Sequence, residues 1–523
     1  MATISGETKK ISELDSATDL TSGDMLVVER QTGGTQKMTY GEMVDKVTED
    51  VINSEEVSGI QQTVTGLTSQ VSSLGQTQTQ QGEALSGLSE TVTEQGETLA
   101  SHTQEINSLG SEKQDKATDP DELGEGYLYQ NEDGDVILVE GGVPGGGSHF
   151  KYGITFDNGA DGTPSNVTYI EDCTGFTPAS GSNLGSWSGT KLLIEYFRPC
   201  VIGPDDSEPK YYLNPSVLTQ KLDGTTAVLT GADGDVMVQV KKLYGKFVNN
   251  GNSITAYISD QKEDDTWFCW TEIDGVEQEY AYRGRYMAGV ASGAGTVMRS
   301  ISGVSKLVNI KRSDGRTYAK NRGTKYHQNN VYLLFLWQFM YLLMYKNRNS
   351  QTALGQGRTA SSNTANVATG WSNNYGCCWG DQGGVNGCVF LWVEDFYGDT
   401  WEWVDGLTVV SDTYKLTKYP SRYNDTGDSF EISVASGLTA SANNGKYVSK
   451  MTGTNAIPFL PAATGGSDST YYCDYFWLAD SVQVAIFGGT WNGAARAGAF
   501  FWTLNSAASL ALASVGSRLC RVA

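Results

Sequence analysis

Residues 331–345 read VYLLFLWQFMYLLMY, the longest apolar run in the sequence. A membrane-spanning helix needs about 20 consecutive apolar residues, whereas this run is shorter and contains Gln338. A helix that is apolar on all sides is normally buried inside a large domain. The sequence therefore predicts a buried helix at about 328–346, with the rest of a large domain packed around it.

The sequence on both sides of this helix is rich in turns and aromatic rings. The chain has 62 Gly, 27 Tyr and 12 Trp but only 11 Pro, which is typical of short strands joined by tight turns. Because 523 residues exceed what one hydrophobic core usually serves, we expect several domains. We expect a β-rich subdomain at 149–230 that leads into a larger domain at 231–523, and a mainly α+β protein overall.

Three shorter units precede this part. Residues 1–50 are expected to form a small module, with a strand at Met25–Val28 and a helix that begins after Thr39. Residues 51–115 carry a coiled-coil pattern. Residues 116–148 combine a β hairpin around the turn NEDGD with the flexible linker GGVPGGGS.

Apolar and amide residues recur in steps of three and four between residues 57 and 109. Such a heptad seam predicts a coiled coil that joins several chains, although it does not give their number. Glycines beside the seam each cost about 1 kcal/mol in helix propensity, so the coil should depend on the domains at its ends. A disordered spacer is the alternative, which the unbroken heptads disfavour. The seam consists of Val57, Ile60, Val64, Leu67, Val71, Leu74, Gln78, Gln81, Leu85, Leu88, Val92, Gln95, Leu99, His102, Ile106 and Leu109.

The chain is strongly acidic, with a formal net charge of −23 and a pI near 4.5. This charge argues against nucleic acid and anionic membranes as partners. The 8 cysteines include no CxxC pair, and the 3 histidines are His102, His149 and His327. We therefore expect buried free thiols, no metal site, no cofactor, no membrane insertion and no histidine-based catalysis.

Three segments of the C-terminal part carry a resemblance to a known family. They are GADGDVMVQVKKLYGKF at 231–247, LLMYKNRNSQTALGQG at 342–357, and VEDFYGDTWEWVDGL at 393–407, followed by FGGTWNGAARAGAFFWTLN and VGSRLC. In this order they resemble the C-type-lectin-fold ligand-binding proteins of phages and prophages, and more narrowly the variable proteins diversified by diversity-generating retroelements. The resemblance covers about 150–523 and implies a C-type-lectin-like domain at 231–523.

The resemblance also implies a variable region at about 470–520. In that family, reverse transcription randomises template adenines, so an AAC codon becomes any NNC codon. NNC codons cannot encode Trp, Met, Lys, Glu or Gln, and the Trp codon holds no adenine. The implied ligand-binding variable positions are Leu478, Ala479, Asp480, Ser481, Ile486, Thr490, Ala495, Arg496, Phe501, Thr503, Ser506, Leu510, Leu512 and Ser514. The implied scaffold is Trp477, Gly488, Gly489, Trp491, Asn492, Gly493, Gly498, Trp502 and Gly516.

These positions suit a binding surface because a rigid scaffold lowers the ordering cost of binding. Where they are exposed, Phe501, Leu510 and Leu512 are expected to supply apolar contact, and Arg496 a directional polar group. The alternative is that these Ala, Ser and Leu residues only pack and form turns.

The N-terminal stretch KKISELDSATDLTSGDMLVVERQTGGTQKMTYGEMV resembles short tail-fibre modules that attach to a virion. Together the resemblances imply a phage or prophage tail-fibre receptor-binding protein, located in the virion tail, that attaches to a bacterial surface receptor, glycan or protein. They also imply a homotrimer through the coil and other tail or baseplate proteins as partners of the N-terminus. The alternative is a bacterial surface-displayed adhesin, which the lack of a signal peptide and of a lipid-anchor motif disfavours.

Two features could indicate chemistry, but we expect no enzyme. An acidic cluster does not match an EF-hand loop, and the calcium-binding triplets of sugar-binding lectins are missing. The resemblance assigns this cluster to the core. The lectin fold also houses formylglycine-generating enzymes, which need two close C-terminal cysteines, whereas Cys473 and Cys520 lie far apart in the sequence. The cluster consists of Glu394, Asp395, Asp399, Glu402 and Asp405.

Overall fold

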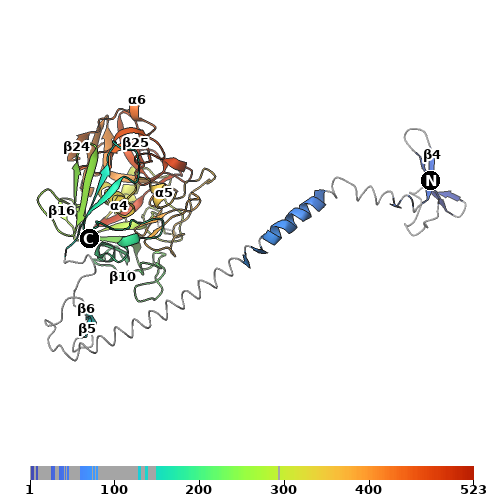
Figure 1. Cartoon of the computed structure of the whole chain (residues 1–523), viewed down its shortest axis with the longest axis horizontal. Helices are drawn as coiled ribbons and strands as arrows, with labels where there is room; N and C mark the ends of the chain where they lie inside the picture. Colours follow the sequence, from blue (N-terminus) through green and yellow to red (C-terminus); the bar gives the residue numbers. More distant parts are fainter. Residues whose placement is uncertain are drawn as a thin grey trace. The chain divides into compact units, whose positions relative to one another are not determined.

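The computed structural model describes residues 2–4, 7–9, 25–29, 35–39, 42, 44–45, 59–73, 75–76, 78–79, 128–130, 136–138, 149–291 and 295–522. The chain divides into two compact units, Met1–Val139 and Glu140–Ala523 (Figure 1). Within the described ranges, no helix combines the length and the apolar character needed to cross a membrane.

Two small antiparallel sheets are described in the first unit. One has the strand order β2 (Glu7–Lys9), β1 (Ala2–Ile4), β3 (Met25–Glu29) and β4 (Thr35–Thr39). The other pairs β5 (Leu128–Gln130) with β6 (Val136–Leu138). The predicted strand at Met25–Val28 and the hairpin around NEDGD are therefore confirmed.

Residues 59–73 are helical and expose part of the predicted heptad seam. Ile60, Val64, Leu67 and Val71 are 55–66% exposed, and their spacing places them on one side of the helix. The helix is thus confirmed over these residues, whereas its association with other chains stays a prediction. The seam residues Val57, Leu74 and those from Gln81 to Leu109 lie outside the described residues.

The second unit is mainly β, which corrects the expected α+β class. Its longer helices are α3 (Arg312–Lys320) and α4 (Val331–Tyr345), and α5 (Ser350–Ala353) and α6 (Ala440–Asn443) are single turns. Short 3₁₀ or π turns occur at η4 (Gly185–Trp187), η5 (Leu192–Tyr196), η6 (Pro420–Arg422) and η7 (Ala494–Arg496). The rest forms short strands because Gly, Asn and Asp turns interrupt the apolar segments every few residues.

These strands form three larger and two smaller sheets. A six-stranded sheet has the order β10 (Tyr211–Tyr212), β9 (Phe197–Ile202), β11 (Asp235–Lys241), β17 (Tyr280–Met287), β31 (Arg518–Val522), β18 (Tyr326–Gln328). A five-stranded sheet has the order β14 (Phe268–Cys269), β12 (Tyr244–Asn249), β13 (Ser253–Ser259), β7 (Lys151–Asp157), β8 (Val167–Glu171). The smaller sheets are β19 (Cys378–Trp379), β20 (Val389–Phe390), β21 (Val393–Glu394), and β15 (Glu272–Ile273), β16 (Val276–Glu277).

The largest sheet has nine strands and contains the predicted variable region. Its order is β24 (Ile432–Ala435), β23 (Thr413–Leu416), β22 (Trp401–Val410), β28 (Val482–Phe487), β29 (Trp502–Ser506), β27 (Tyr475–Leu478), β25 (Lys446–Met451), β26 (Pro461–Gly466), with β30 (Val515–Gly516) paired to β22. Because β9 and β10 share the six-stranded sheet with β31, residues 149–230 and the C-terminal end belong to one unit.

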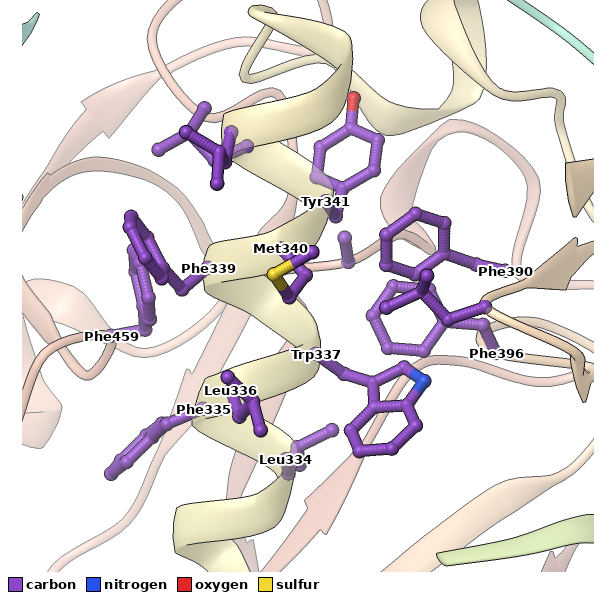
Figure 2. Packing of buried hydrophobic residues seen from close by; sticks show 14 of the residues in the cluster. Leu334, Phe335, Leu336, Trp337, Phe339, Met340, Tyr341, Phe390, Phe396 and Phe459 are labelled. Atoms are coloured by element: carbon purple, nitrogen blue, oxygen red, sulfur yellow. The ribbon is translucent and has the colours of Figure 1, made fainter. Parts of the chain in front are cut away.

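Helix α4 forms the centre of this unit, with its residues at most 3% exposed, as predicted. Asn330 caps it by accepting hydrogen bonds from the Tyr332 and Leu333 N–H groups. Its side chains pack outward in all directions, and Figure 2 shows Phe339 facing Phe459 while other rings meet Phe390 and Phe396. A helix with no polar side can be stable in water only when strands cover it all round.

Candidate ligand-binding face

The predicted variable region forms the neighbouring strands β27, β29 and β28. β27 and β29 run parallel, with Trp477 opposite Thr503, whereas β28 runs antiparallel to β29, with Ile486 opposite Thr503. Turn 479–481 therefore lies where β28 begins, and loop 488–501 starts where β28 ends. Because a strand rises about 3.3 Å per residue, roughly 17–20 Å separate these two places. The predicted variable positions thus do not form one small patch.

Segment 507–514 runs back across the sheet between these two ends. β29 ends at Ser506, which is opposite Val484, whereas Val515 pairs with Trp401 near the far end of β28. On the way, Leu510 packs against the cluster that contains Val484 and Ile486. We call the side of the sheet that carries this cluster the outer face. The opposite side packs against the α4 core.

Loop 488–501 is fixed mainly through its backbone. The Trp491 N–H donates to the Asp399 carbonyl at 2.9 Å. Gln338, the one amide side chain of α4, donates from Nε2 to the Ala499 carbonyl at 2.7 Å. The loop is thereby attached to the centre of the core, which explains why a buried amide is tolerated inside an apolar helix.

Two asparagines from segment 358–366 join the two loops. Asn363 Nδ2 donates to the Trp491 carbonyl at 2.9 Å, and Asn366 Nδ2 donates to the Ala513 carbonyl at 3.3 Å. Neither asparagine is recognisable from the sequence alone, because nothing in the sequence pattern connects segment 358–366 with the C-terminal region. Both loops are therefore positioned by hydrogen bonds to their main chain, which do not require particular loop side chains.

Nine of the predicted variable positions reach the surface and five do not. Phe501 is 2% exposed, so its ring does not meet the condition of exposure under which it was expected to supply apolar contact. The exposed or half-buried positions are Ala479, Asp480, Ser481, Thr490, Ala495, Arg496, Leu510, Leu512 and Ser514. The buried positions are Leu478, Ile486, Phe501, Thr503 and Ser506.

Phe501 instead lies beneath a row of half-buried rings on the outer face. Its ring centroid is 4.6 Å from that of Trp401 and 6.3 Å from that of Tyr475. Tyr475 in turn contacts Trp477 at 5.3 Å, and the Arg496 guanidinium lies 5.9 Å from the Tyr475 centroid. These contacts connect loop 488–501 with the strands as one continuous surface.

We call this surface the loop face. It combines six predicted variable positions with three rings. Trp477 was a predicted scaffold residue, whereas Tyr475 and Trp401 were not among the predicted site residues. The loop face consists of Thr490, Ala495, Arg496, Leu510, Leu512, Ser514, Trp401, Tyr475 and Trp477.

The predicted scaffold residues mostly lie inside. Gly489 adopts a φ of +103°, and a Cβ there would lie 2.5 Å from the Ala497 Cβ, so a side chain does not fit. Trp502 is buried and donates from Nε1 to the Phe459 carbonyl at 2.8 Å. Gly488, Gly489, Gly493, Gly498, Trp502 and Gly516 are buried, Trp477 and Trp491 are half-buried, and Asn492 is exposed.

A polar pocket of about 310 Å³ adjoins the loop face at Ala495. Its lining includes four amide side chains, among them Gln351 and Gln356, and the buried Asp474. Burial raises the pKa of Asp474 well above its ordinary value, although the N–H that Phe500 donates to it at 2.6 Å favours the charged form. A pocket of this kind can hold a small group rich in hydrogen-bond donors and acceptors.

The acidic cluster at 394–405 is part of the buried framework below this surface. Glu402 is 2% exposed and accepts hydrogen bonds from Arg518 at 2.8 Å, Arg283 at 3.1 Å and Asn329 at 2.7 Å. Because Arg518 belongs to β31 and Glu402 to β22, this pair joins the two largest sheets. Its partner set leaves no open position for a substrate.

Lys306 neutralises two further carboxylates of the cluster. Its Nζ lies 2.6 Å from Asp395 Oδ2 and also contacts Asp399, and all three side chains are buried. Burial opposes the charge on Lys306, but the two carboxylates outweigh this effect and raise the pKa of the ammonium group. Asp405 is likewise buried and pairs with Arg316 at 3.0 Å. The carboxylates thus hold segments together, as the resemblance implied.

The described cysteines and histidines are arranged as structural residues. The cysteines are buried and free, as expected. Burial raises the pKa of Cys473 to about 12 and that of Cys520 to about 11, so neither thiol ionises readily near neutral pH. His327 is buried, and burial lowers its pKa. Among the described residues, no three His, Cys, Asp or Glu side chains converge as metal ligands.

No family model matches this chain, and no curated protein matches it. Among solved structures, the chain is similar to a Major Tropism Determinant U1 variant, with 13% identity over 71% of this chain and 72% of that chain, at a TM-score of 0.22. It is also similar to the P3c variant (10% identity, 76% and 95% covered, TM-score 0.22) and the M1 variant (13% identity, 75% and 78% covered, TM-score 0.22). Identities and scores of this size do not establish the function of this chain.

Proposed function

We propose that this protein is the receptor-binding fibre of a phage or prophage tail, which attaches the particle to a bacterial surface ligand through the loop face. In this proposal the protein acts by binding alone, without enzymatic activity or cofactor. Residues 1–50 attach the fibre to other tail or baseplate proteins, and the seam at 57–109 joins three copies. Three loop faces on one particle add avidity to weak single-site contacts.

One observation carries the proposal: the loop face presents exposed side chains on loops whose backbone is held by other segments. Asn363, Asn366 and Gln338 bind loop carbonyls, so the loop conformation does not depend on which side chains the loops present.

Binding to host cells tests the proposal. Labelled full-length protein should bind cells of the host, and the double variant Arg496→Ala, Leu512→Ser should lose most of this binding while its unfolding midpoint stays unchanged. Lys262→Ala, at an exposed position on a turn of the five-stranded sheet region, is the matched control and should bind as the parent does. Equal binding by the double variant and the control would disprove the assignment of the loop face.

The gene neighbourhood tests the diversification that the sequence resemblance implies. A near-copy of the segment that encodes about 470–520 should lie nearby, with its mismatches at adenines. The mismatches should then fall at the exposed positions of the loop face more often than at the buried Leu478 and Ile486. If a copy exists and its mismatches concentrate on buried positions, the loop face is not the diversified surface.

A further inference from the structure

A large cavity of the second unit is lined by residues outside the loop face. It is a groove of about 870 Å³ between the segment that contains η5, β9 and β10 on one side and residues 374–379 with Trp392 on the other. None of the predicted variable positions lines it. Binding clefts for small molecules usually measure about 300–1,000 Å³, so this groove can take a ligand of several sugar or amino-acid units.

The floor of the groove is one side of the six-stranded sheet. Arg198 on β9 is directly opposite Gln239 on β11, and Lys241 is directly opposite Tyr280 on β17. Because side chains alternate along a strand, Gln239 and Lys241 point to the same side. Tyr212 completes the row, with the Arg198 guanidinium 3.4 Å from its ring centroid. The floor therefore combines tyrosine rings with the cations Arg198 and Lys241, whereas the amide of Gln239 is buried and bonded to Tyr212 and Tyr282.

One wall of the groove is a stack of half-buried rings. Tyr375 and Trp379 stack with centroids 4.4 Å apart and an interplanar angle of 28°. Trp392 stands beside them and is fixed by the hydrogen bond that its Nε1 donates to the Pro215 carbonyl at 2.8 Å. A wall of rings held by such contacts is rigid before a ligand arrives, which lowers the ordering cost of binding.

The charge of the groove is opposite to that of the chain. Its lining residues include two cations, Arg198 and Lys241, and one carboxylate, the exposed Glu195, although the net charge of the chain is −23. Neither cation has a carboxylate within ion-pair distance in the part of the chain that the structure describes. Both lie against tyrosine rings instead, Lys241 at 5.2 Å from the Tyr196 centroid. Their N–H groups can thus donate to a ligand anion.

We propose that this groove binds an acidic oligosaccharide, as a second ligand site distinct from the loop face. The C–H faces of sugar rings pack on the rings of Tyr375 and Trp379, and the ligand carboxylates bond to Arg198 and Lys241. This combination of aromatic surface and a few placed polar groups is how small-ligand sites usually gain specificity. The proposal does not depend on the proposed role of the loop face.

Calorimetry on the full-length protein at low salt tests this site. The probes are matched pairs of tetrasaccharides, each with a uronic or sialic acid carboxylate in one member and an uncharged group in the other. We expect an acidic member to bind at least about tenfold more tightly than its neutral partner, because hydrogen bonds to charged groups contribute about 1.5–3 kcal/mol. Added salt should weaken this binding.

Variants locate the binding. Lys241→Gln and Trp379→Ala should each weaken binding of the acidic tetrasaccharide about tenfold or more. The loop-face variant Arg496→Gln should leave this binding unchanged. If no acidic member binds more tightly than its neutral partner at millimolar concentration, the proposal is wrong. It is also wrong if the groove is protected from hydrogen exchange by a second copy of the chain, or if Lys241→Gln and Trp379→Ala, both folded, bind as the parent does.

Discussion

Helix α4 and segment 507–514 show two different ways in which a chain is held in place. α4 is held by its side chains, which are buried on all sides and contact rings such as Phe247 and Trp502. Segment 507–514 is held largely by its main chain, whose carbonyls at Leu512, Ala513 and Ser514 accept hydrogen bonds from other segments. Substitution should therefore be costly in α4 and inexpensive in the segment, and such inexpensive positions are where a binding protein can vary its contacts.

The largest difference is expected for Phe339→Ala in α4. Phe339 is fully buried, and its ring lies 5.3 Å from Phe247 and 6.1 Å from Trp270. Removing a buried ring leaves a cavity and costs about 3–5 kcal/mol of unfolding free energy. Denaturant unfolding followed by tryptophan fluorescence measures this loss. A loss as small as that of a surface variant would contradict the central role of α4.

The next effect is a gain in stability that depends on pH. In the folded protein Asp474 holds its proton to higher pH than in the unfolded chain, so its contribution to stability is greatest below about pH 4 and falls as pH rises. The variant Asp474→Asn has no carboxyl at this position to ionise, so it does not lose stability as the pH rises. Its side-chain oxygen can still accept the hydrogen bond from the Phe500 N–H. We expect the unfolding free energy of the variant to exceed that of the parent by more than about 1 kcal/mol at pH 8, and by a smaller amount at pH 5. A gain that is equal at both pH values would show that Asp474 does not titrate as inferred.

A smaller loss is expected for Asn363→Ala, which acts on the loop and not on the core. The side chain donates to the Gly384 and Trp491 carbonyls, both at 2.9 Å, and losing these bonds costs about 1–2 kcal/mol. Hydrogen exchange should increase in residues 490–496 but not in α4. Asn250→Ala on the β12–β13 turn serves as the control. Faster exchange in α4 would mean that loop and core are not independent.

The smallest change in stability is expected for Leu512→Ser on the loop face. Leu512 is 46% exposed, and substitutions at such positions usually change the unfolding free energy by less than about 0.5 kcal/mol. Binding to host cells should nevertheless weaken, since the apolar contact is lost. If stability falls as much as in Asn363→Ala, the side chain is needed for packing, and the segment is not free to vary.

Local patterns in the sequence were sufficient to place some elements. The apolar run at 331–345 and the strand at Met25–Val28 are recognisable because each depends on neighbouring residues only. The predicted α+β class was wrong. The apolar helix gives the most prominent local pattern in the sequence, but it occupies only the centre of a unit that otherwise consists of strands. Pairing of those strands joins residues far apart in the sequence, such as Ala281 with Val522 and Phe156 with Ile254.

The candidate surface was only partly predictable for a related reason. The codon argument does not distinguish the exposed Arg496 from the buried Phe501, because NNC codons encode both arginine and phenylalanine. The alternation of β27 could have placed Tyr475 and Trp477 on one side and Phe476 and Leu478 on the other. Which side faces solvent depends on α4 and on segment 507–514, and neither is adjacent to β27 in the sequence.

The most direct test randomises the six variable positions of the loop face with NNC codons and sorts the displayed library twice, for resistance to protease and for binding to host cells. A matched library randomises the buried Leu478, Ile486, Phe501 and Thr503. We predict that most members of the loop-face library stay protease-resistant while few retain cell binding, and that most members of the buried library lose protease resistance. A loop-face library that loses protease resistance as often as the buried one, or that keeps cell binding throughout, would contradict the assignment of this surface.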